Sequence, residues 1–409
     1  MTHLWTLRDY RLLFSASAIS NLGDGVSALA FPWLATLITR DPVLIALVAF
    51  ATKLPWLLFS IPAGVWTDRA DRRRLMVQAD LLRMGLTCGV IAIILSVPSF
   101  PVEQDLLYIG ALSVLAFLLG SAEVVRDNAA QTVLPSVVPG DRLEQANGQI
   151  WSIEQVMGSF VGPPLAGVLI ALAVPAPFAL DAVTFGLAAG LVWCMAIAPR
   201  IRPARRSWLV EAREGIAWLR SHRTVLQLAV MLGLMNALSL MTVTVLILFS
   251  QEILGLGAAG HGLLLTAGAA GGVAGGILCP GIAARLGQRR SLMVALLALG
   301  AALVVIWAAT SVWVVAFALF VEMFAALLWN VVTVSYRQRL IPDDLLGRVN
   351  SLYRFFGWGM MPFGALLGGW IVALGEPSLG REVALRLPYL LGGLGMGVIW
   401  LYALRRLRL

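Results

Sequence analysis

Three ionisable side chains, Asp24, Lys53 and Glu322, lie deep within long apolar stretches of the sequence. A charge at the centre of a bilayer costs at least about 2.5 kcal/mol on insertion scales, so such residues mark functional pathways. Because a helix rises 1.5 Å per residue, Asp24 and Lys53 would reach a similar depth if their stretches are membrane helices. Two interpretations stay open for them: an ion pair that neutralises both charges, or a protonatable or substrate-contacting group in a cavity.

Glu322 has no partner of opposite charge within its own apolar stretch. We therefore predict that it is the leading candidate for proton coupling or cation recognition in the second half of the chain. Trp33 follows Asp24 in the first stretch and is a candidate for lining a cavity for a bulky apolar ligand. We expect Asp181 to lie near the outer membrane surface, where water reduces the cost of its charge.

The composition places all of these residues in a membrane protein. Of the 409 residues, 59% are hydrophobic and 13% are charged, about half the charged share of a soluble globular protein. A spanning helix needs about 20 apolar residues. Twelve stretches meet this requirement: 12–38, 44–65, 75–97, 105–126, 150–173, 177–198, 225–250, 262–284, 291–309, 312–335, 350–374 and 386–404.

Arginines are concentrated in alternate loops, which predicts the orientation. One set of loops contains Arg8, Arg69, Arg142, Arg200, Arg285, Arg337 and Arg405, among others, whereas the opposite set contains Arg40, Arg381 and Arg386. Loops rich in arginine stay in the cytoplasm. We therefore expect a multi-pass protein of a bacterial-type cytoplasmic (inner) membrane with both termini cytoplasmic. The net charge of +8 then reflects topology and gives no reason to expect a nucleic-acid partner.

A charged segment divides the chain into two parts. Between residues 200 and 223, Trp208, Leu209, Ala212, Ile216 and Leu219 recur at helical spacing among arginines, which predicts an amphipathic helix on the membrane surface. We expect an N-terminal six-helix bundle (1–199), a cytoplasmic linker (200–223) and a C-terminal six-helix bundle (224–409).

The two parts also resemble each other. Residues 64–76 and 281–293 share a glycine, an Arg-Arg pair and a Leu-Met pair at one constant offset, and residues 139–147 match residues 342–350. Repeated halves are typical of secondary transporters, whose substrate site lies between them. The predicted fold is all-α: twelve transmembrane helices in two six-helix bundles around a central cavity.

The segment from Gly64 to Arg74 resembles the G-x-x-x-D-R-x-G-R-R signature of the major facilitator superfamily, although Asp71 replaces the second glycine. Together with Asp80-Leu-Leu-Arg83 it is similar to the drug:proton antiporter branch that includes macrolide-efflux proteins and siderophore exporters. The resemblance extends to Asn21-Leu-Gly-Asp24-Gly25, Phe31-Pro-Trp33 and Gly162-Pro-Pro-x-x-Gly167. It implies cavity roles for Asn21 and Asp24, and covers nearly the whole chain.

The resemblance implies a latch that holds a cytoplasmic gate shut, formed by Gly64, Asp68, Arg69, Arg72, Arg73, Asp80 and Arg83. Simple anchoring of arginines at headgroups is the alternative. Asp68 could cap the next helix or pair with an arginine, and Arg72 to Arg74 could face lipid headgroups and the cytoplasm. The resemblance also implies an antiporter-type fifth span, with Gly158, Gly162, Pro163 and Gly167; ordinary close packing is the alternative.

We therefore expect a secondary active transporter, specifically a proton-coupled exporter of amphipathic small molecules such as drugs or siderophores. A lysophospholipid flippase or a solute importer on the same fold is the alternative. An enzyme finds little support: H-E-x-x-H and G-x-S-x-G are absent, and a P-loop would need a lysine other than Lys53. We expect no metal and no cofactor, energy from a proton gradient, and a monomer in the bilayer.

Overall fold

The computed structural model describes residues 4–97, 99–197, 216–342, 349, 352–353 and 355–407, without the side chains of residues 60, 61, 64–66, 68 and 69. These parts of the chain are helical and include no strand. Among them, eleven helices are long and apolar enough to cross a membrane. The chain is therefore a multi-pass, all-α membrane protein.

The helices group into two compact units. The first contains residues 1–40, 51–205 and 257–263, and the second contains residues 41–50, 206–256 and 264–409. Residues 41–50 therefore belong to the second unit, although the chain on both sides of them belongs to the first. Residues 257–263 belong to the first unit, although the chain on both sides of them belongs to the second.

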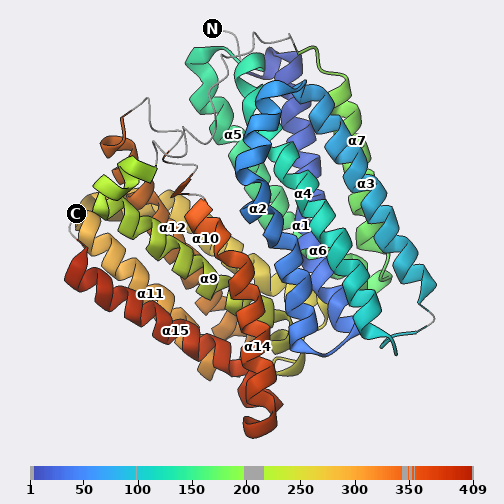
Figure 1. Ribbon diagram of the computed structural model, residues 1–409, viewed down its shortest axis with the longest axis vertical. Coiled ribbons are helices and arrows are strands. Elements are labelled where there is room, and N and C mark those ends of the chain that lie inside the picture. Colours follow the sequence, from blue (N-terminus) through green and yellow to red (C-terminus); the bar gives the residue numbers. More distant parts are fainter. Residues whose placement is uncertain are drawn as a thin grey trace. The chain divides into compact units, whose positions relative to one another are not determined.

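The helices of the first unit pack side by side, with α1 against α7 and α3 against both α4 and α7 (Figure 1). The arrangement places α7 between α3 and α1, which bears Asp24. Their bounds are α1 Arg8–Ile38, α2 Pro42–Arg69, α3 Arg72–Ser96, α4 Asp105–Val137, α5 Leu143–Gln155, α6 Gly162–Leu172 and α7 Ala176–Trp193.

The predicted fifth span is one continuous run of three pieces. A π-helical segment, η3 (Val156–Val161), joins α5 to α6. Pro163 and Pro164 follow it at the first turn of α6. Because proline lacks a backbone N–H, the carbonyls one turn earlier lose their usual partners, and π-helical turns are frequent at functional sites.

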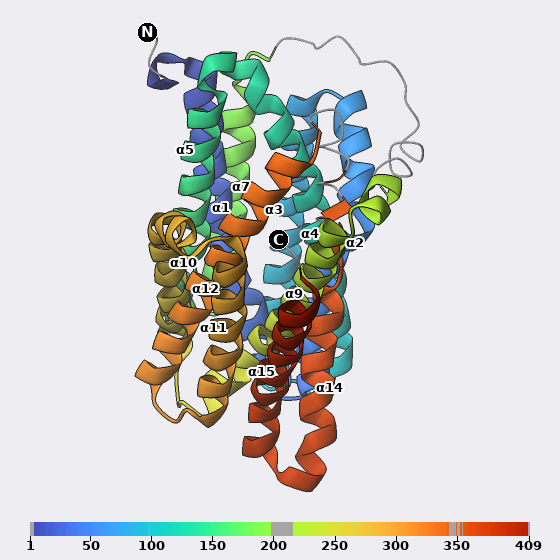
Figure 2. The same ribbon diagram turned by 90° about the vertical axis from the view of Figure 1, so that its left-hand side faces the viewer.

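In the second unit, α11 lies between α12 and α15, and α9 contacts α14 and α15 (Figure 2). Residues 355–359 are helical and precede α14. The bounds are α9 Arg223–Glu252, α10 Ala258–Leu286, α11 Gln288–Ala308, α12 Val312–Leu340, α14 Met361–Leu379 and α15 Arg381–Arg406.

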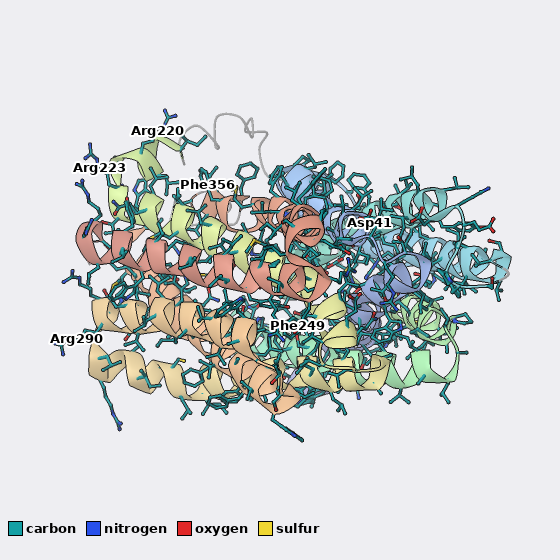
Figure 3. The ribbon with its side chains drawn as sticks, turned by 90° about the horizontal axis from the view of Figure 1, so that it is seen from below. Asp41, Arg220, Arg223, Phe249, Arg290 and Phe356 are labelled. Atoms are coloured by element: carbon teal, nitrogen blue, oxygen red, sulfur yellow. The ribbon has the colours of Figure 1, made fainter. Side chains whose placement is uncertain are left out.

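Arginines gather at one end of this second unit. Arg220, Arg223 and Arg290 project from the same end (Figure 3). The last turns of α12 and α15 also carry arginines, Arg339 and Arg406 among them. Gly287, with a φ of 76°, separates α10 from α11 at this end. A residue with a Cβ adopts that conformation only with strain.

Each predicted span corresponds to a helical segment, although several ends differ: the fifth was expected from residue 150 and begins at Leu143, the tenth was expected to end at residue 335 and continues to Leu340, and the eleventh was expected to end at residue 374 and continues to Leu379. The fourth was expected to end at residue 126, but α4 continues to Val137, so Arg126 and Asp127 lie inside a long helix and not at its end. The first is a 31-residue helix, α1, but it is not among the eleven apolar helices. Polar residues such as Asn21 and Asp24 lower its hydropathy.

The predicted linker helix lies largely outside the described residues, which resume at Ile216. Residues 216–221 are helical, and Leu219 is buried in the hydrophobic core of the second unit. Trp218 stacks on His222 with ring centroids 3.8 Å apart. This end of the segment therefore packs on protein through Leu219, and the expected placement of the segment on lipid headgroups stays a prediction.

Close glycine contacts join α1 to the fifth span. A Cβ at Gly25 would collide with the carbonyl oxygen of Gly158, and a Cβ at Gly162 would lie 2.6 Å from the Cα of Gly25. Neither backbone can move aside without shifting a whole helix. Glycine at these positions therefore permits the two helices to approach closely.

We predict that Gly162→Val lowers the melting temperature of the purified protein, because overpacking a close contact costs about 1–3 kcal/mol. Gly85→Val is the matched control, since nothing lies within 4 Å of a Cβ built at Gly85 in α3. Both variants would be compared by thermal unfolding in detergent. Equal melting temperatures would contradict the packing role of Gly162.

Candidate functional site

A network of charged side chains runs through the interior of the first unit. Helices α1 to α5 and α7 all contribute to it. Its members, here called the N-terminal charge network, are Asp24, Lys53, Asp80, Arg83, Glu123, Arg126, Asp127, Glu154 and Asp181.

Arg83 is the central cation of this network. Its side chain is 3% exposed and forms a salt bridge with Asp24, near the middle of α1. It also pairs with Asp80 at 3.6 Å and donates a hydrogen bond to Ser20 Oγ at 3.2 Å. The guanidinium carbon lies 3.8 Å from the ring centroid of Phe185, in a cation–π contact. Arg83 thus links α1, α3 and α7.

Arg126 is the second buried cation, with its side chain 1% exposed. Its Nε lies 3.7 Å from Asp80 Oδ1, and its NH1 lies 3.5 Å from Asp127 Oδ1. Asp80 therefore lies between two guanidinium groups, although neither of its oxygens makes a hydrogen bond. The ion pairs form a continuous chain across α1, α3 and α4.

Asp181 belongs to the same interior, which corrects the sequence-based placement near the outer surface. It is 1% exposed and accepts a hydrogen bond from Ser27 Oγ at 2.5 Å. Its other oxygen, Oδ1, has no hydrogen-bond partner. Space for this carboxyl comes from Gly23, because a Cβ there would collide with Asp181 Oδ1 and Thr184 Oγ1. The position of Asp181, five residues after the start of the apolar helix α7, was the sequence feature that could have indicated a buried carboxylate.

Of the two interpretations left open for Asp24 and Lys53, the mutual ion pair does not form. Asp24 pairs with Arg83, whereas Lys53 in α2 acts electrostatically on Glu123. A similar depth along two neighbouring helices does not determine the direction in which each side chain points.

The predicted latch residues divide into two groups. Asp80 and Arg83 lie about two and three turns into α3 and belong to the buried network. Arg72 donates a hydrogen bond to the Thr132 carbonyl at 2.8 Å, and Arg73 donates one to the Met195 carbonyl at 2.9 Å. These two arginines thus join α3 to α4 and to the chain after α7; their expected roles in a latch or at headgroups stay predictions.

The helix cap near this latch is Asp71. Asp71 accepts a hydrogen bond from the Arg74 backbone N–H and caps α3, whereas the expected role of Asp68, as a cap or as the partner of an arginine, stays a prediction. Asp71 occupies the position where the superfamily signature has glycine, so the departure from the signature has a structural function. The side chains of Gly64, Asp68 and Arg69 lie outside the described residues.

Asn21 and Trp33 both lie on α1 with Asp24. Asn21 donates a hydrogen bond to the Ser17 carbonyl of its own helix at 2.9 Å. Trp33 is 9% exposed, and its ring centroid lies 6.2 Å from that of His261. Their roles at a cavity stay predictions.

The predicted fifth-span residues lie directly beside Asp24. Gly158 in η3 and Gly162 in α6 contact Gly25, the residue after Asp24. Gly167 contacts Ala258, since a Cβ at Gly167 would lie 2.5 Å from the Ala258 carbonyl oxygen. The π-helical segment is therefore adjacent to the charge network.

Glu322 is a buried carboxylate of the second unit. It is 6% exposed and accepts a hydrogen bond from Ser239 Oγ at 3.2 Å. Among the described residues no cation forms a salt bridge with it, which agrees with the absence of an opposite charge in its own stretch. The two units thus differ in the charge chemistry of their interiors.

The all-helical fold and the charged interior define a membrane transporter of the major facilitator type. The model of the transmembrane secretion effector family matches residues 5–399. The chain therefore belongs to this family, whose members are transporters and not enzymes.

Two characterised relatives match parts of the chain. The multidrug efflux pump Tap of Mycobacterium tuberculosis is 30% identical over 169 residues, which cover 39% of this chain and 37% of Tap. Macrolide efflux protein A of Streptococcus pyogenes is 23% identical over 225 residues, covering 54% of this chain and 53% of that protein. The chain thus aligns with about a third to a half of the length of these relatives.

Solved structures share the fold over the whole chain. A bacterial homologue of the iron transporter ferroportin in an inward-facing state has a TM-score of 0.75 at 17% identity and covers 98% of this chain and 99% of its own. The nucleoside transporter NupG has a TM-score of 0.74 at 11% identity, covering 97% and 99%. These likenesses confirm the predicted fold class.

We predict that Arg83→Met destabilises the protein by about 3–5 kcal/mol, because removing one partner of a buried ion pair leaves the other charge uncompensated. Arg74→Met is the control, since the Arg74 side chain is 71% exposed and its pair with Asp71 is at the surface. Thermal unfolding of both variants would measure the difference. A melting temperature for Arg83→Met equal to that of Arg74→Met would refute the central role of Arg83.

Proposed function

We propose that the chain is a proton-coupled exporter, an antiporter that moves amphipathic small molecules such as drugs or siderophores by alternating access. The observation that supports this most directly is the imbalance of the N-terminal charge network. Six carboxylates, Asp24, Asp80, Glu123, Asp127, Glu154 and Asp181, face three cations, Lys53, Arg83 and Arg126.

An excess of negative charge in a low-dielectric interior is costly unless it is compensated. Protons supply one compensation, and a cationic or hydrogen-bonding substrate supplies another. If the two compete for the same carboxylates, binding of substrate releases protons and binding of protons releases substrate. This competition is the thermodynamic requirement for antiport.

Asp24 is the carboxylate best suited to that exchange. Its side chain is 26% exposed, whereas Asp80 in the same network is fully buried. Asp24 can therefore be reached by a proton or a substrate while its salt bridge with Arg83 transmits the change in charge to the rest of the network. The partial relatives Tap and macrolide efflux protein A, named as efflux pumps, support export.

We further propose a bacterial-type cytoplasmic membrane as the location, with both termini cytoplasmic. The arginines gathered at one end of the second unit (Figure 3) support this orientation, because arginine-rich loops stay on the cytoplasmic side. We expect no resident cofactor, with the proton gradient as energy source, and a monomer as the working unit.

We predict that Asp24→Asn and Glu322→Gln each reduce pH-driven flux at least about tenfold, since a hydrogen bond to a charged group contributes about 1.5–3 kcal/mol. Flux of a lipophilic cation such as ethidium would be measured in proteoliposomes under an imposed pH gradient. Asp141→Asn and Glu103→Gln are matched controls, because both residues are exposed. Normal flux in both test variants would refute coupling through these carboxylates.

Export should also collapse when an uncoupler dissipates the proton gradient. The assay is a drug and siderophore sensitivity screen in an efflux-deficient host, with Asp24→Asn as the inactive control. Protection by the wild type that the uncoupler abolishes is the expected result. Undiminished export under the uncoupler would exclude antiport with protons, and movement of labelled lysolipid in vesicles without drug protection would favour a flippase.

A further inference from the structure

Arg83 reaches across α7 to bind α1. Helix α7 lies between α3 and α1. The Arg83 guanidinium lies over the ring of Phe185 in α7 and forms its salt bridge with Asp24 in α1. The salt bridge therefore provides a direct electrostatic link between two helices that are separated by a third.

A second carboxylate, Asp80, lies within reach of the same guanidinium. Arg83 NH1 is 3.6 Å from Asp80 Oδ1, whereas NH2 contacts Asp24. Asp80 and Arg83 are both on α3, about one turn apart, so this pair does not depend on the packing between helices. Arg126 of α4 is a further neighbour of Asp80, at 3.7 Å. The guanidinium thus faces one carboxylate on another helix and one on its own.

Asp80 has unused capacity for hydrogen bonds. Its side chain is 0% exposed, and neither of its oxygens accepts a hydrogen bond. A carboxylate offers about four acceptor sites. Because an N–H···O hydrogen bond has an ordinary length of about 2.9 Å, the 3.6 Å separation from Arg83 NH1 exceeds it by about 0.7 Å. A small movement of the Arg83 side chain therefore suffices to form the bond.

Neutralisation of Asp24 makes this second carboxylate necessary. The Arg83 side chain is 3% exposed, and a buried guanidinium without a counter-charge is costly. Asp24 is 26% exposed and can take up a proton from water, whereas Asp80 is fully buried. Among the described residues, Asp80 is then the charged carboxylate that remains within salt-bridge distance of Arg83.

We propose that Asp80 is a positioning residue that receives Arg83 when Asp24 is neutralised, so that α1 is released from α3. The inference rests on the proposed exchange of protons and substrate at Asp24 and adds the route by which that exchange moves a helix. A proton from water binds an Asp24 oxygen, the Arg83–Asp24 salt bridge is lost, and Arg83 NH1 donates a hydrogen bond to Asp80 Oδ1. Arg83 keeps all of its protons, so one proton enters and one carboxylate becomes neutral.

Phe185 permits the exchange without exposing Arg83. The guanidinium carbon lies 3.8 Å from the ring centroid, and cation–π attraction extends to about 6 Å, so a movement below about 1 Å keeps this contact. On α1 the neutral hydroxyl of Ser20, which accepts a hydrogen bond from NH1 at 3.2 Å, remains a neighbour. The attraction between opposite charges, however, moves from the α1–α3 pair to a pair within α3.

Other charged groups surround these three residues. From the neighbouring helices they are Lys53 of α2, Glu123, Arg126 and Asp127 of α4, Glu154 of α5 and Asp181 of α7. The segments η3 and α6, which pack against α1, carry no titratable side chain. Asp181 is the alternative acceptor, since its Oδ1 also lacks a hydrogen bond. Within the described part of the chain it forms no salt bridge with Arg83, which favours Asp80.

The test measures the distance between α1 and α3 together with the protonation of Asp24. Spin labels would be attached to Cys88, an exposed cysteine of α3, and to Ala28→Cys, at an exposed position of α1. Cys194→Ser removes the other exposed cysteine, and Cys279 is buried. Pulsed dipolar EPR of the full-length protein in nanodiscs reports the distance distribution. Infrared spectroscopy reports protonation of Asp24 as the carboxyl band that Asp24→Asn removes.

In the labelled parent we expect acidic pH to shift the α1–α3 distance distribution as the Asp24 band appears. Asp24→Asn should show the shifted distribution already at neutral pH, because its neutral side chain no longer holds the charge of Arg83. In Asp80→Asn the shift should be lost even where the Asp24 band has formed, because Arg83 then lacks the second carboxylate.

Two further variants should keep the shift. Asp181→Asn removes the alternative acceptor, and Asp141→Asn is the surface control, since the Asp141 side chain is 77% exposed. Retention of the shift in Asp80→Asn, or its loss in Asp181→Asn, would overturn the assignment of Asp80.

The comparison of Asp24→Asn with the parent decides the proposal even if Asp80→Asn does not fold. Equal distance distributions of these two proteins at neutral pH would refute the release of α1. The absence of an Asp24 band at any pH would instead refute proton exchange at Asp24 itself, so failure of the proposed function is distinguished from failure of this inference.

Discussion

The structure of the first unit depends on one constraint: charges inside a membrane protein must be compensated by other groups of the protein. Arg83 and Arg126 do this for Asp24, Asp80 and Asp127 through a continuous chain of ion pairs. The chain needs helices that approach closely, and glycines permit it. Gly23 makes room for the Asp181 carboxyl, while Gly25 allows the fifth span to contact α1. The same short segment of α1 therefore provides both the close helix contacts, through Gly23 and Gly25, and the ion-paired carboxylate Asp24.

Much of the fold could be predicted from the sequence because the bilayer imposes a simple rule of length and apolarity. The rule failed where charges are compensated inside the protein. Arg126 and Asp127 indicated the end of a span, but α4 continues beyond them because Asp80 offsets Arg126. Likewise, the depth of Asp24 was predictable, whereas its partner Arg83 was not, since pairing depends on helix rotation and on contacts between α1 and α3. Asp181 was misplaced for the same reason, because Ser27 on another helix supplies its hydrogen bond.

The two units have similar helices and different interiors. The first compensates several carboxylates with guanidinium groups, whereas in the second Glu322 accepts a hydrogen bond from the Ser239 hydroxyl. The charge of an ion-paired carboxylate is offset by the cation beside it. A carboxylate beside a neutral hydroxyl has no such cation, so in a low-dielectric site its charge is far more costly. The two copies of the repeat therefore share their helical scaffold and differ in the charged groups of their interiors.

The location of the π-helical segment connects charge with shape in the first unit. Helix η3 places Gly158 against Gly25, the residue that follows Asp24. A segment of π-helix followed by Pro163 and Pro164 has fewer regular backbone hydrogen bonds than an α-helix, so it deforms at lower cost. A change in the charge of Asp24 alters its salt bridge with Arg83 and hence the forces on α1 at this contact. Because glycine contacts are close and have no flexible side chains between them, a displacement of α1 is transmitted directly to the backbone of η3. The carboxylate proposed to exchange protons with substrate thus lies one residue before the contact of α1 with this irregular segment.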